Sequence, residues 1–299
     1  MIRINKKGFI YAVSSAVIFG FMPLFTKIIY SMGAGSVSAG FYRVSLSLFT
    51  ILIIQLLLKN KIKLSLKEFL VLLIPAISFI GTVISLYSSY NYIGSGLATS
   101  LHFLYPVIIF LFTIIMTRSK ASSVEIICLF VSMISIFMLM GKNTSLDIRG
   151  VLLAIFSAFT YSIYSISLQN NNIKKINSFT ILFYINLFAS IILLIYSFIA
   201  KEKIFLPASF NDWVFIFLYS TILTIGAAFF YQKGVEFIGA KYTANLSILE
   251  PVVGVLSGII FMRERASSLQ MLAIILILFS TLVLVNSSNK KEIQKASNY

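Results

Sequence analysis

The chain has 299 residues, of which 59% are hydrophobic and 11% are charged, and its formal net charge is +15 at pH 7. Soluble domains are about 45–50% apolar, so one water-soluble core could not bury this much apolar surface. The composition therefore excludes an ordinary soluble protein and predicts that the folded chain lies in lipid.

Ten apolar stretches follow one another along the chain, each close to the roughly 20 residues that cross a bilayer core as a helix. The first could instead be a cleavable signal peptide, because basic residues precede it and small residues follow it. Its length, and the repetition of its pattern in the second half, favour a membrane span. The predicted spans are residues 8–30, 37–58, 69–90, 96–116, 124–140, 150–168, 179–199, 213–232, 242–262 and 269–285.

Two of these spans carry one pattern, which reads LHFLYPV at 101–107 and LSILEPV at 246–252. At this offset of 145, residues 94–140 and 239–285 align without a gap, and 14 of 47 positions are identical. Chance matches between apolar segments would not also align Pro106 with Pro251, or RSKASS with RERASS. The sequence therefore predicts an internal duplication.

A repeat of five helices starts on opposite sides of the membrane each time, because five is an odd number. The predicted fold is an all-α membrane protein whose ten transmembrane helices form two five-helix repeats of inverted topology. Sixteen Lys and Arg residues fall on the side of both termini and six on the other, while Lys27 and Arg43 lie inside spans. This bias predicts a multi-pass protein of the cell membrane with both termini in the cytoplasm. It also indicates that the positive charge borders the membrane and attracts anionic lipid headgroups rather than nucleic acid.

Tyr105 and Glu250 occupy equivalent places near the middle of the fourth and ninth spans. Helical spacing places His102 on the same face as Tyr105, and Ser247 on the same face as Glu250. The sixth and eighth spans add three further hydroxyls that need partners far from the membrane interface. We expect these side chains to surround one central cavity, although small polar residues also serve tight helix packing. The three added hydroxyls belong to Tyr161, Tyr164 and Tyr231.

Three ionisable residues are candidates for substrate binding or coupling. A charge at mid-span costs about 2.5–3.5 kcal/mol on insertion scales, so Glu250 must be protonated, paired or hydrated. Its alternative role is to cap backbone groups freed by Pro251. His102, the single histidine, could carry a proton or contact the substrate, and its alternative is a packing role. Arg43 lies about two turns from the outer surface and is a candidate for substrate binding or gating.

The Pro-Val motifs, the RSKASS and RERASS turns and the Glu250-Pro251 pair resemble EamA domains, which build ten-helix members of the drug/metabolite transporter superfamily. The resemblance covers two consecutive units, residues 9–140 and 149–285. It implies a transporter of amino acids or related metabolites, usually exported. The first unit departs from the second by having Tyr105 in place of Glu250, so only the second supplies a carboxylate at mid-span.

Motifs of enzymes and pumps are not recognisable in the sequence. There is no GxxxxGK[ST] loop, and one Cys with one His offers no zinc pattern, so we expect no cofactor and no bound metal. We therefore expect a secondary transporter, not an enzyme, that moves a small organic metabolite by alternating access as a monomer or homodimer, with a proton as the candidate coupling ion. The alternatives are a membrane-embedded enzyme, which would need several acids or histidines at one depth, and a non-transporting membrane subunit. Substrate identity, direction, coupling ion and oligomeric state are not determined by the sequence.

Overall fold

The computed structural model describes residues 6–60, 62–93, 95–118, 122–138, 147–263 and 267–297, and every regular element within them is a helix. The helices are α1 (Lys6–Gly20), α2 (Met22–Ser31), α3 (Ser36–Ser45), α4 (Ser47–Leu57), α5 (Leu66–Ser89), α6 (Ser95–His102), α7 (Tyr105–Thr117), α8 (Ser123–Met138), α9 (Ile148–Ser167), α10 (Ser178–Ile199), α11 (Phe210–Thr221), η1 (Ile222–Ala228), α12 (Phe229–Ser247), α13 (Glu250–Met262) and α14 (Ser268–Ser297).

The described helices are those of a multi-pass membrane protein. Seven stretches are long and apolar enough to cross a bilayer, and three shorter apolar helices accompany them. The longest, Phe210–Ser247, has 38 residues and joins the predicted eighth and ninth spans. Within it Gly239 has φ 81° and ψ 160°, so the helix is broken there. The other six are Lys6–Ser31, Ser36–Leu57, Leu66–Ser89, Leu97–Thr117, Ile148–Ser167 and Ser178–Ile199, and the short ones are Ser123–Met138, Glu250–Phe261 and Ser268–Val283.

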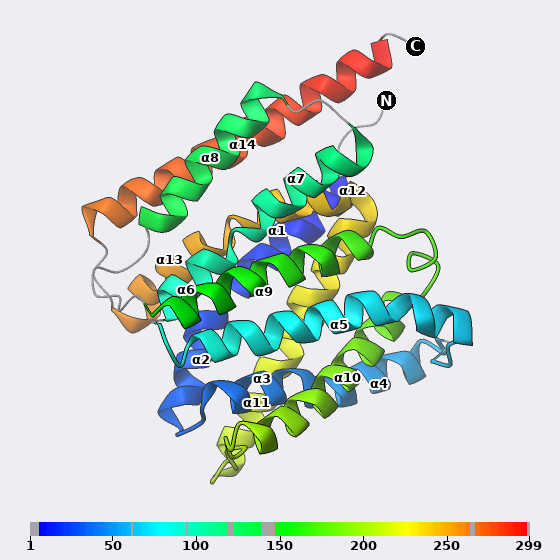
Figure 1. Ribbon diagram of the computed structural model, residues 1–299, viewed down its shortest axis with the longest axis vertical. Helices are drawn as coiled ribbons and strands as arrows, with labels where there is room; N and C mark the ends of the chain where they lie inside the picture. Colours follow the sequence, from blue (N-terminus) through cyan, green and yellow to red (C-terminus); the bar gives the residue numbers. More distant parts are fainter. Residues whose placement is uncertain are drawn as a thin grey trace.

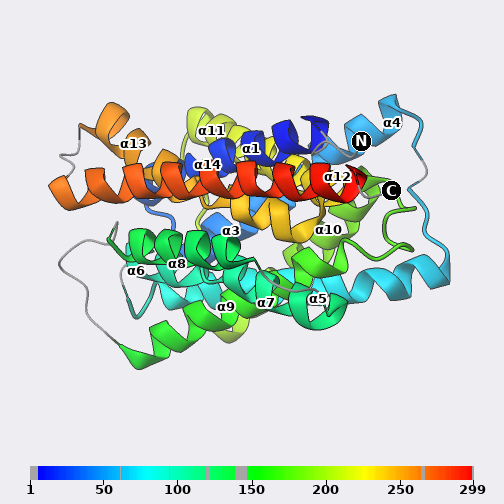
Figure 2. The ribbon, with the colours of Figure 1, turned by 90° about the horizontal axis from the view of Figure 1, so that it is seen from above.

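The helices pack as one elongated bundle, in which α1 begins and α14 ends at the same end (Figure 1). At one edge α8 and α14 lie side by side (Figures 1 and 2), joined by a hydrogen bond of 2.8 Å between Ser132 and Ser280. In the interior, α5 packs along α9, and α1 packs along η1 and α12. Buried hydroxyls connect these pairs, such as Thr82 and Thr160 at 2.9 Å. Small polar residues thus allow the close approach typical of helices in membranes.

Two helices are interrupted at the Pro-Val motifs. The first break lies between His102, where α6 ends, and Tyr105, where α7 begins. The second lies between Ser247, where α12 ends, and Glu250, where α13 begins. In each case a proline follows the break and supplies no N–H to the carbonyl four residues earlier. The two interruptions lie at equivalent positions of the sequence repeat, within the predicted spans 96–116 and 242–262, where the sequence analysis predicted no break.

Helix ends are also repeated. Four residues other than glycine have positive φ in the described part of the chain, at 51° for Lys59, 49° for Arg118, 56° for Lys201 and 54° for Arg263. They form two equivalent pairs, because the repeat aligns Lys59 with Lys201 and Arg118 with Arg263. Each lies at a helix C-terminus, where a left-handed residue ends the helix and a cation is electrostatically favourable.

Two equivalent glycine–isoleucine contacts join the halves. A Cβ atom added at Gly8 would lie 2.6 Å from Cγ2 of Ile238, and one added at Gly150 would lie 2.9 Å from Cγ2 of Ile93. The repeat aligns the two glycines with each other and the two isoleucines with each other. Each half therefore supplies the glycine to one contact and the isoleucine to the other. This reciprocity is what a pseudo-two-fold relation between two halves produces.

The π-helix η1 marks the place where the halves differ in length. Ser65 and Ser209 begin equivalent helices with the same capping box, at an offset of 144. Further along these helices, Gly81 and Gly226 correspond at an offset of 145. The second half therefore contains one additional residue between these points, and η1 lies there. A π-helix accommodates an additional residue within a continuous helix and is frequent at functional sites.

Candidate functional site

Glu250 and Tyr105 are the first residues of the resumed half-helices α13 and α7. A helix N-terminus carries partial positive charge, which favours a carboxylate at that place. The Glu250 side chain is half-buried, and the hydroxyl of Ser247 lies close enough to interact with it. No side-chain hydrogen bond caps α13. The N-cap residue of α13 is Leu249, whose side chain cannot cap, so the alternative capping role of Glu250 stays a prediction.

The tyrosines expected near Glu250 meet in one group, the inner tyrosine cluster of Tyr105, Tyr161, Tyr164 and Tyr231. The ring centroid of Tyr161 lies 4.7 Å from that of Tyr105, 5.5 Å from that of Tyr164 and 5.6 Å from that of Tyr231. Glu250 acts electrostatically on three of the four. The structure thus brings together residues from α7, α9, α12 and α13.

Hydrogen bonds hold part of this cluster and leave part of it free. Tyr231 and Ser165 hydroxyls are 2.5 Å apart, and Nε2 of Gln232 donates to the Tyr164 hydroxyl at 3.2 Å. The hydroxyls of Tyr105 and Ser247 are buried without a hydrogen-bond partner of normal geometry among the described residues. An unsatisfied buried hydroxyl costs about 1–3 kcal/mol. The Ser247 hydroxyl lies within reach of both Tyr105 and Glu250, so a ligand or water at this place would contact all three side chains.

His102 lies at the edge of the same cluster. Its ring centroid is 5.4 Å from that of Tyr105 and 5.3 Å from that of Tyr161. Its Nδ1 lies 2.9 Å from Oγ of Ser157, which itself donates to the Ala154 carbonyl at 2.6 Å. Because the serine has one proton to donate, Nδ1 of a neutral His102 carries the hydrogen and Nε2 remains an acceptor.

Arg43 lies near the junction of α3 and α4 and is half-buried. Its guanidinium carbon is 5.3 Å from the centroid of the Phe19 ring, and Nη1 is 3.8 Å from Sδ of Met22. Among the described residues, no carboxylate lies within the 4.0 Å of an ion pair with it. Glu250 is within its electrostatic range but farther away than that.

Two features near these residues were not found from the sequence. Tyr87 and Tyr219 interact electrostatically with Arg43 and are buried with unpaired hydroxyls. Lys241 pairs with Glu125 at 2.9 Å between α12 and α8, although Lys241 resembled a loop cation in the sequence. The signal for the tyrosines was weak, because tyrosines near span ends are usually interfacial anchors.

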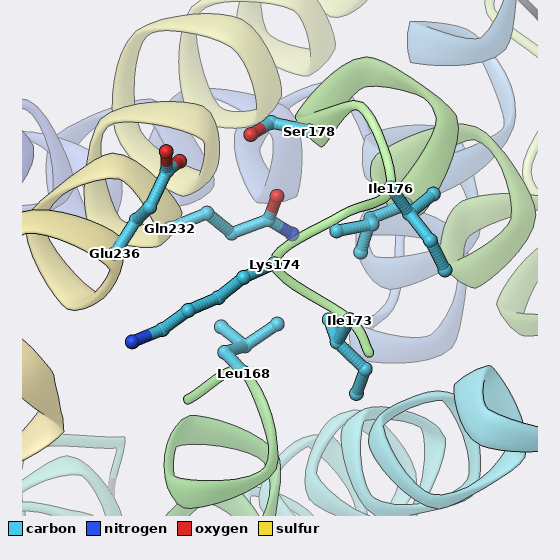
Figure 3. A pocket seen from close by; sticks show the side chains of 8 residues that line it. Leu168, Ile173, Lys174, Ile176, Ser178, Gln232 and Glu236 are labelled. Carbon is cyan, nitrogen blue, oxygen red and sulfur yellow. The ribbon is translucent and has the colours of Figure 1, made fainter. Parts of the chain in front are cut away.

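A small pocket lies beside the inner tyrosine cluster, where the loop between α9 and α10 meets α12 (Figure 3). Gln232 points into it and is 4% exposed. Since Nε2 of this residue is bonded to Tyr164, the pocket ends at a side chain that contacts the cluster. Its lining consists of Leu168, Ile173, Lys174, Ile176, Ser178, Ile181, Gln232 and Glu236.

The described residues contain no group of three or more His, Cys, Asp or Glu side chains that could hold a metal ion. The chemical resources of the site are instead one carboxylate, one guanidinium, one imidazole and several phenols. Such a set can bind and orient a small polar molecule and move a proton.

Comparison with known proteins places this arrangement in a family. A family model of EamA-like transporters matches residues 6–141 and 148–286. A comparison with curated proteins finds no match. Twenty-nine chains of solved structures are similar. One of them, described only as a crystal structure of a protein, is 15% identical with a TM-score of 0.80, covering 96% of this chain and 99% of that chain. That likeness concerns the fold alone, whereas the family match spans both halves: the chain belongs to the EamA-like transporter family.

Proposed function

We propose that this protein is a secondary transporter that exports a small organic metabolite, an amino acid or related compound, by alternating access. The substrate binds between the two broken helices, where His102, Ser247, Arg43 and the inner tyrosine cluster surround it. The observation that carries the proposal is that two half-helices begin at Tyr105 and Glu250, which interact electrostatically and share Ser247 as a neighbour. In transporters with inverted repeats, such discontinuous helices form the substrate site near the bilayer midplane.

The proposal includes ten spans in two inverted five-helix units, residues 9–140 and 149–285. Ten crossings result when Phe210–Ser247 is divided at Gly239 and its second part is continued by α13. The reciprocal contacts of Gly8 and Gly150 support the two-fold relation between the units. The expected end of the first unit, Met140, lies outside the described residues.

The orientation follows from charge. The end of the bundle at which α1 begins also holds the turn between α9 and α10 (Figure 1), which carries Lys174 and Lys175. We assign this end to the cytoplasm, because short cytoplasmic loops carry an excess of Lys and Arg.

Cysteine labelling of intact cells tests the assignment. A cysteine in place of the exposed Ala208, at the other end, should react with an impermeant reagent, whereas one in place of the exposed Asn172 should not. A cysteine in place of Ser145, which lies outside the described residues, should also be labelled from outside. Labelling at Asn172 but not at Ala208 and Ser145 would refute the topology.

We propose that Glu250 binds and releases the proton that is coupled to transport. It is a half-buried carboxylate that interacts with Ser247 and with three tyrosines, so protonation would change the charge of the site itself. A carboxylate that alternates between the two sides can take up a proton on one side and release it on the other.

Flux into proteoliposomes without nucleotide tests the function. A thermal-shift screen against amino acids, polyamines, nucleosides and sugars first identifies a ligand, because binding stabilises the folded state. The wild type should then move this ligand in a saturable and pH-dependent way. Glu250→Gln should remain folded, bind the ligand and lose the pH dependence. A Glu250→Gln protein with the pH dependence of the wild type would refute proton coupling through this residue, and the absence of flux for every bound ligand would refute transport.

A further inference from the structure

Arg43 is a charged side chain inside the helix bundle that has no acid beside it among the described residues. A guanidinium in a membrane interior requires a compensating partner, since an unpaired charge there costs several kcal/mol. The flat contact with Phe19 contributes only about 0.5–2 kcal/mol, and the Met22 sulfur is a weak acceptor. Neither contact carries a negative charge, and no carboxylate of the described residues lies within ion-pair distance of Arg43.

Two tyrosines from other helices approach the same place. Tyr219 on α11 precedes Ser220, whose Oγ donates to the backbone carbonyl of Arg43 at 2.7 Å. Tyr87 on α5 packs against α3 one turn before Arg43, where a Cβ added at Gly40 would lie 3.3 Å from its ring. Both side chains interact electrostatically with Arg43, and the Tyr87 hydroxyl lies within reach of the Arg43 guanidinium and of the Tyr219 hydroxyl, although neither hydroxyl meets normal hydrogen-bond geometry. The two phenols and the guanidinium thus converge from three helices.

Both phenol hydroxyls are buried and unpaired. Tyr87 is 2% exposed and Tyr219 is 1% exposed, and neither hydroxyl has a hydrogen-bond partner of normal geometry in the described part of the chain. Thr26, which interacts with Tyr219, also has an unpaired buried hydroxyl. Native structures rarely leave several buried donors unsatisfied at one place. Water could hydrate all three groups, but only an anion would also neutralise the charge of Arg43.

We propose that Arg43, Tyr87 and Tyr219 form a binding subsite for an anionic group of the transported substrate, and that this group is a carboxylate. A carboxylate accepts two parallel hydrogen bonds from the planar guanidinium and has lone pairs left for both phenols. One ligand group can thus bond to a guanidinium without an adjacent acid and to two phenol hydroxyls that lack hydrogen bonds of normal geometry. The use of this subsite in transport rests on the proposed function, whereas the binding of an anion does not.

The test measures anion binding to the full-length protein in nanodiscs of zwitterionic lipid, with the melting temperature as readout. Sodium acetate replaces sodium chloride at constant ionic strength, acetamide is the neutral control, and inorganic phosphate is the second anion. Acetate should raise the melting temperature in a saturable way and acetamide should not. Arg43→Gln should weaken acetate binding at least about 10-fold, because a charge-assisted hydrogen-bond pair is lost.

The tyrosines supply variants that keep the test decisive if Arg43→Gln does not fold. Tyr87→Phe and Tyr219→Phe should each weaken acetate binding about 3- to 10-fold without lowering the melting temperature in chloride, because each removes a hydroxyl that is unpaired in the absence of ligand. Tyr11→Phe, whose ring stacks on Phe237 at the other end of the bundle, is the matched control and should change nothing.

Several results would overturn the proposal: no saturable effect of acetate, equal acetate binding by the wild type and Arg43→Gln, or phenylalanine variants that lose stability in chloride but bind acetate normally. Stronger binding of phosphate than of acetate would overturn the assignment to a carboxylate. Acetate binding as expected, together with no flux in proteoliposomes, would refute the transport function and leave the anion subsite standing.

Discussion

Lys241 and Glu125 form a buried ion pair, and its removal allows a quantitative prediction. Their side chains are 16% and 5% exposed, and Nζ lies 2.9 Å from Oε1. Oε2 accepts the N–H of Ser122 at 3.0 Å, and Nζ also lies 4.7 Å from the centroid of the Phe110 ring. Lys241→Met keeps most of the side-chain volume but removes the Lys241 cation from the buried carboxylate.

The exposed fractions decide the expected magnitude. Ion pairs on the surface contribute about 0–1 kcal/mol, whereas breaking one member of a buried pair costs about 3–5 kcal/mol. With both side chains largely buried, we expect Lys241→Met and Glu125→Met each to lower the free energy of unfolding by about 3 kcal/mol. The double variant should recover most of this loss, because apolar replacement of a whole buried pair is often neutral or stabilising.

Reversible unfolding in mixed micelles, arranged as a double-mutant cycle, measures these values. The control is Lys233→Met, which breaks the pair between Lys233 and Glu236 on one helix face. That pair is closer, at 2.7 Å, but its side chains are 25% and 35% exposed, so the loss should be below about 1 kcal/mol. The reasoning is refuted if Lys241→Met loses no more than the control, or if the two single losses add in the double variant.

Three further predictions concern packing and pH. Gly150→Ala should lower the melting temperature by the equivalent of about 1–3 kcal/mol, because its Cβ would lie 2.8 Å from the nearest side-chain atom; an unchanged melt would contradict this contact. Ser132→Ala and Ser280→Ala each remove the same hydrogen bond of 2.8 Å between α8 and α14, so the double variant should lose about as much as one single variant, and additive losses would argue against the bond. Hydrogen bonds from Arg149 lower the pKa of Asp147, so the stability that this group contributes is present above its unfolded pKa and is lost as pH falls through the folded pKa. Asp147→Asn should therefore melt with less dependence on acid than the wild type, and equal pH profiles would refute the assignment.

The repeat could be predicted from the sequence because it leaves a pattern along the chain. The alignment of Pro106 with Pro251 predicted a duplication, and the structure shows that the helices before both prolines end at equivalent positions, which the sequence analysis did not predict. The membrane class followed from composition, since apolar surface must be removed from water whatever the fold. The tyrosines of the inner cluster could be grouped because helical spacing and the repeat put them on facing helices.

Other features depend on contacts between distant segments, which no local pattern encodes. Glu125 and Lys241 are 116 residues apart, and nothing near either residue indicates that α8 and α12 bring them together. The burial of the Tyr87 and Tyr219 hydroxyls could not be predicted either, because tyrosines occur both at the membrane interface and in the protein interior. The additional residue in η1 is recognised only from the structure. The helix starts at Ser65 and Ser209 show an offset of 144 between the halves, and the offset has become 145 at Gly81 and Gly226.

The two halves agree in backbone and disagree in charge, and under the proposed alternating access this difference would favour one of the two states. In the repeat, Arg43 corresponds to Ile185 and Glu250 to Tyr105, while the partners in the buried pair, Glu125 and Lys241, correspond to Gln270 and Gly96. If the two halves were identical, the state open to one side of the membrane and the state open to the other would have equal free energy, because exchanging the conformations of the halves converts one state into the other. In the proposed cycle, a buried ion pair that has no equivalent in the repeat would remove that equality, because a transition that separates Lys241 from Glu125 has no charged counterpart between Gly96 and Gln270. A preference of about 1.4 kcal/mol is already a tenfold ratio of populations. The charged residues that the duplication does not share are therefore the ones that can set the resting state of the transporter, and they are the positions at which Lys241→Met and Glu250→Gln should shift it.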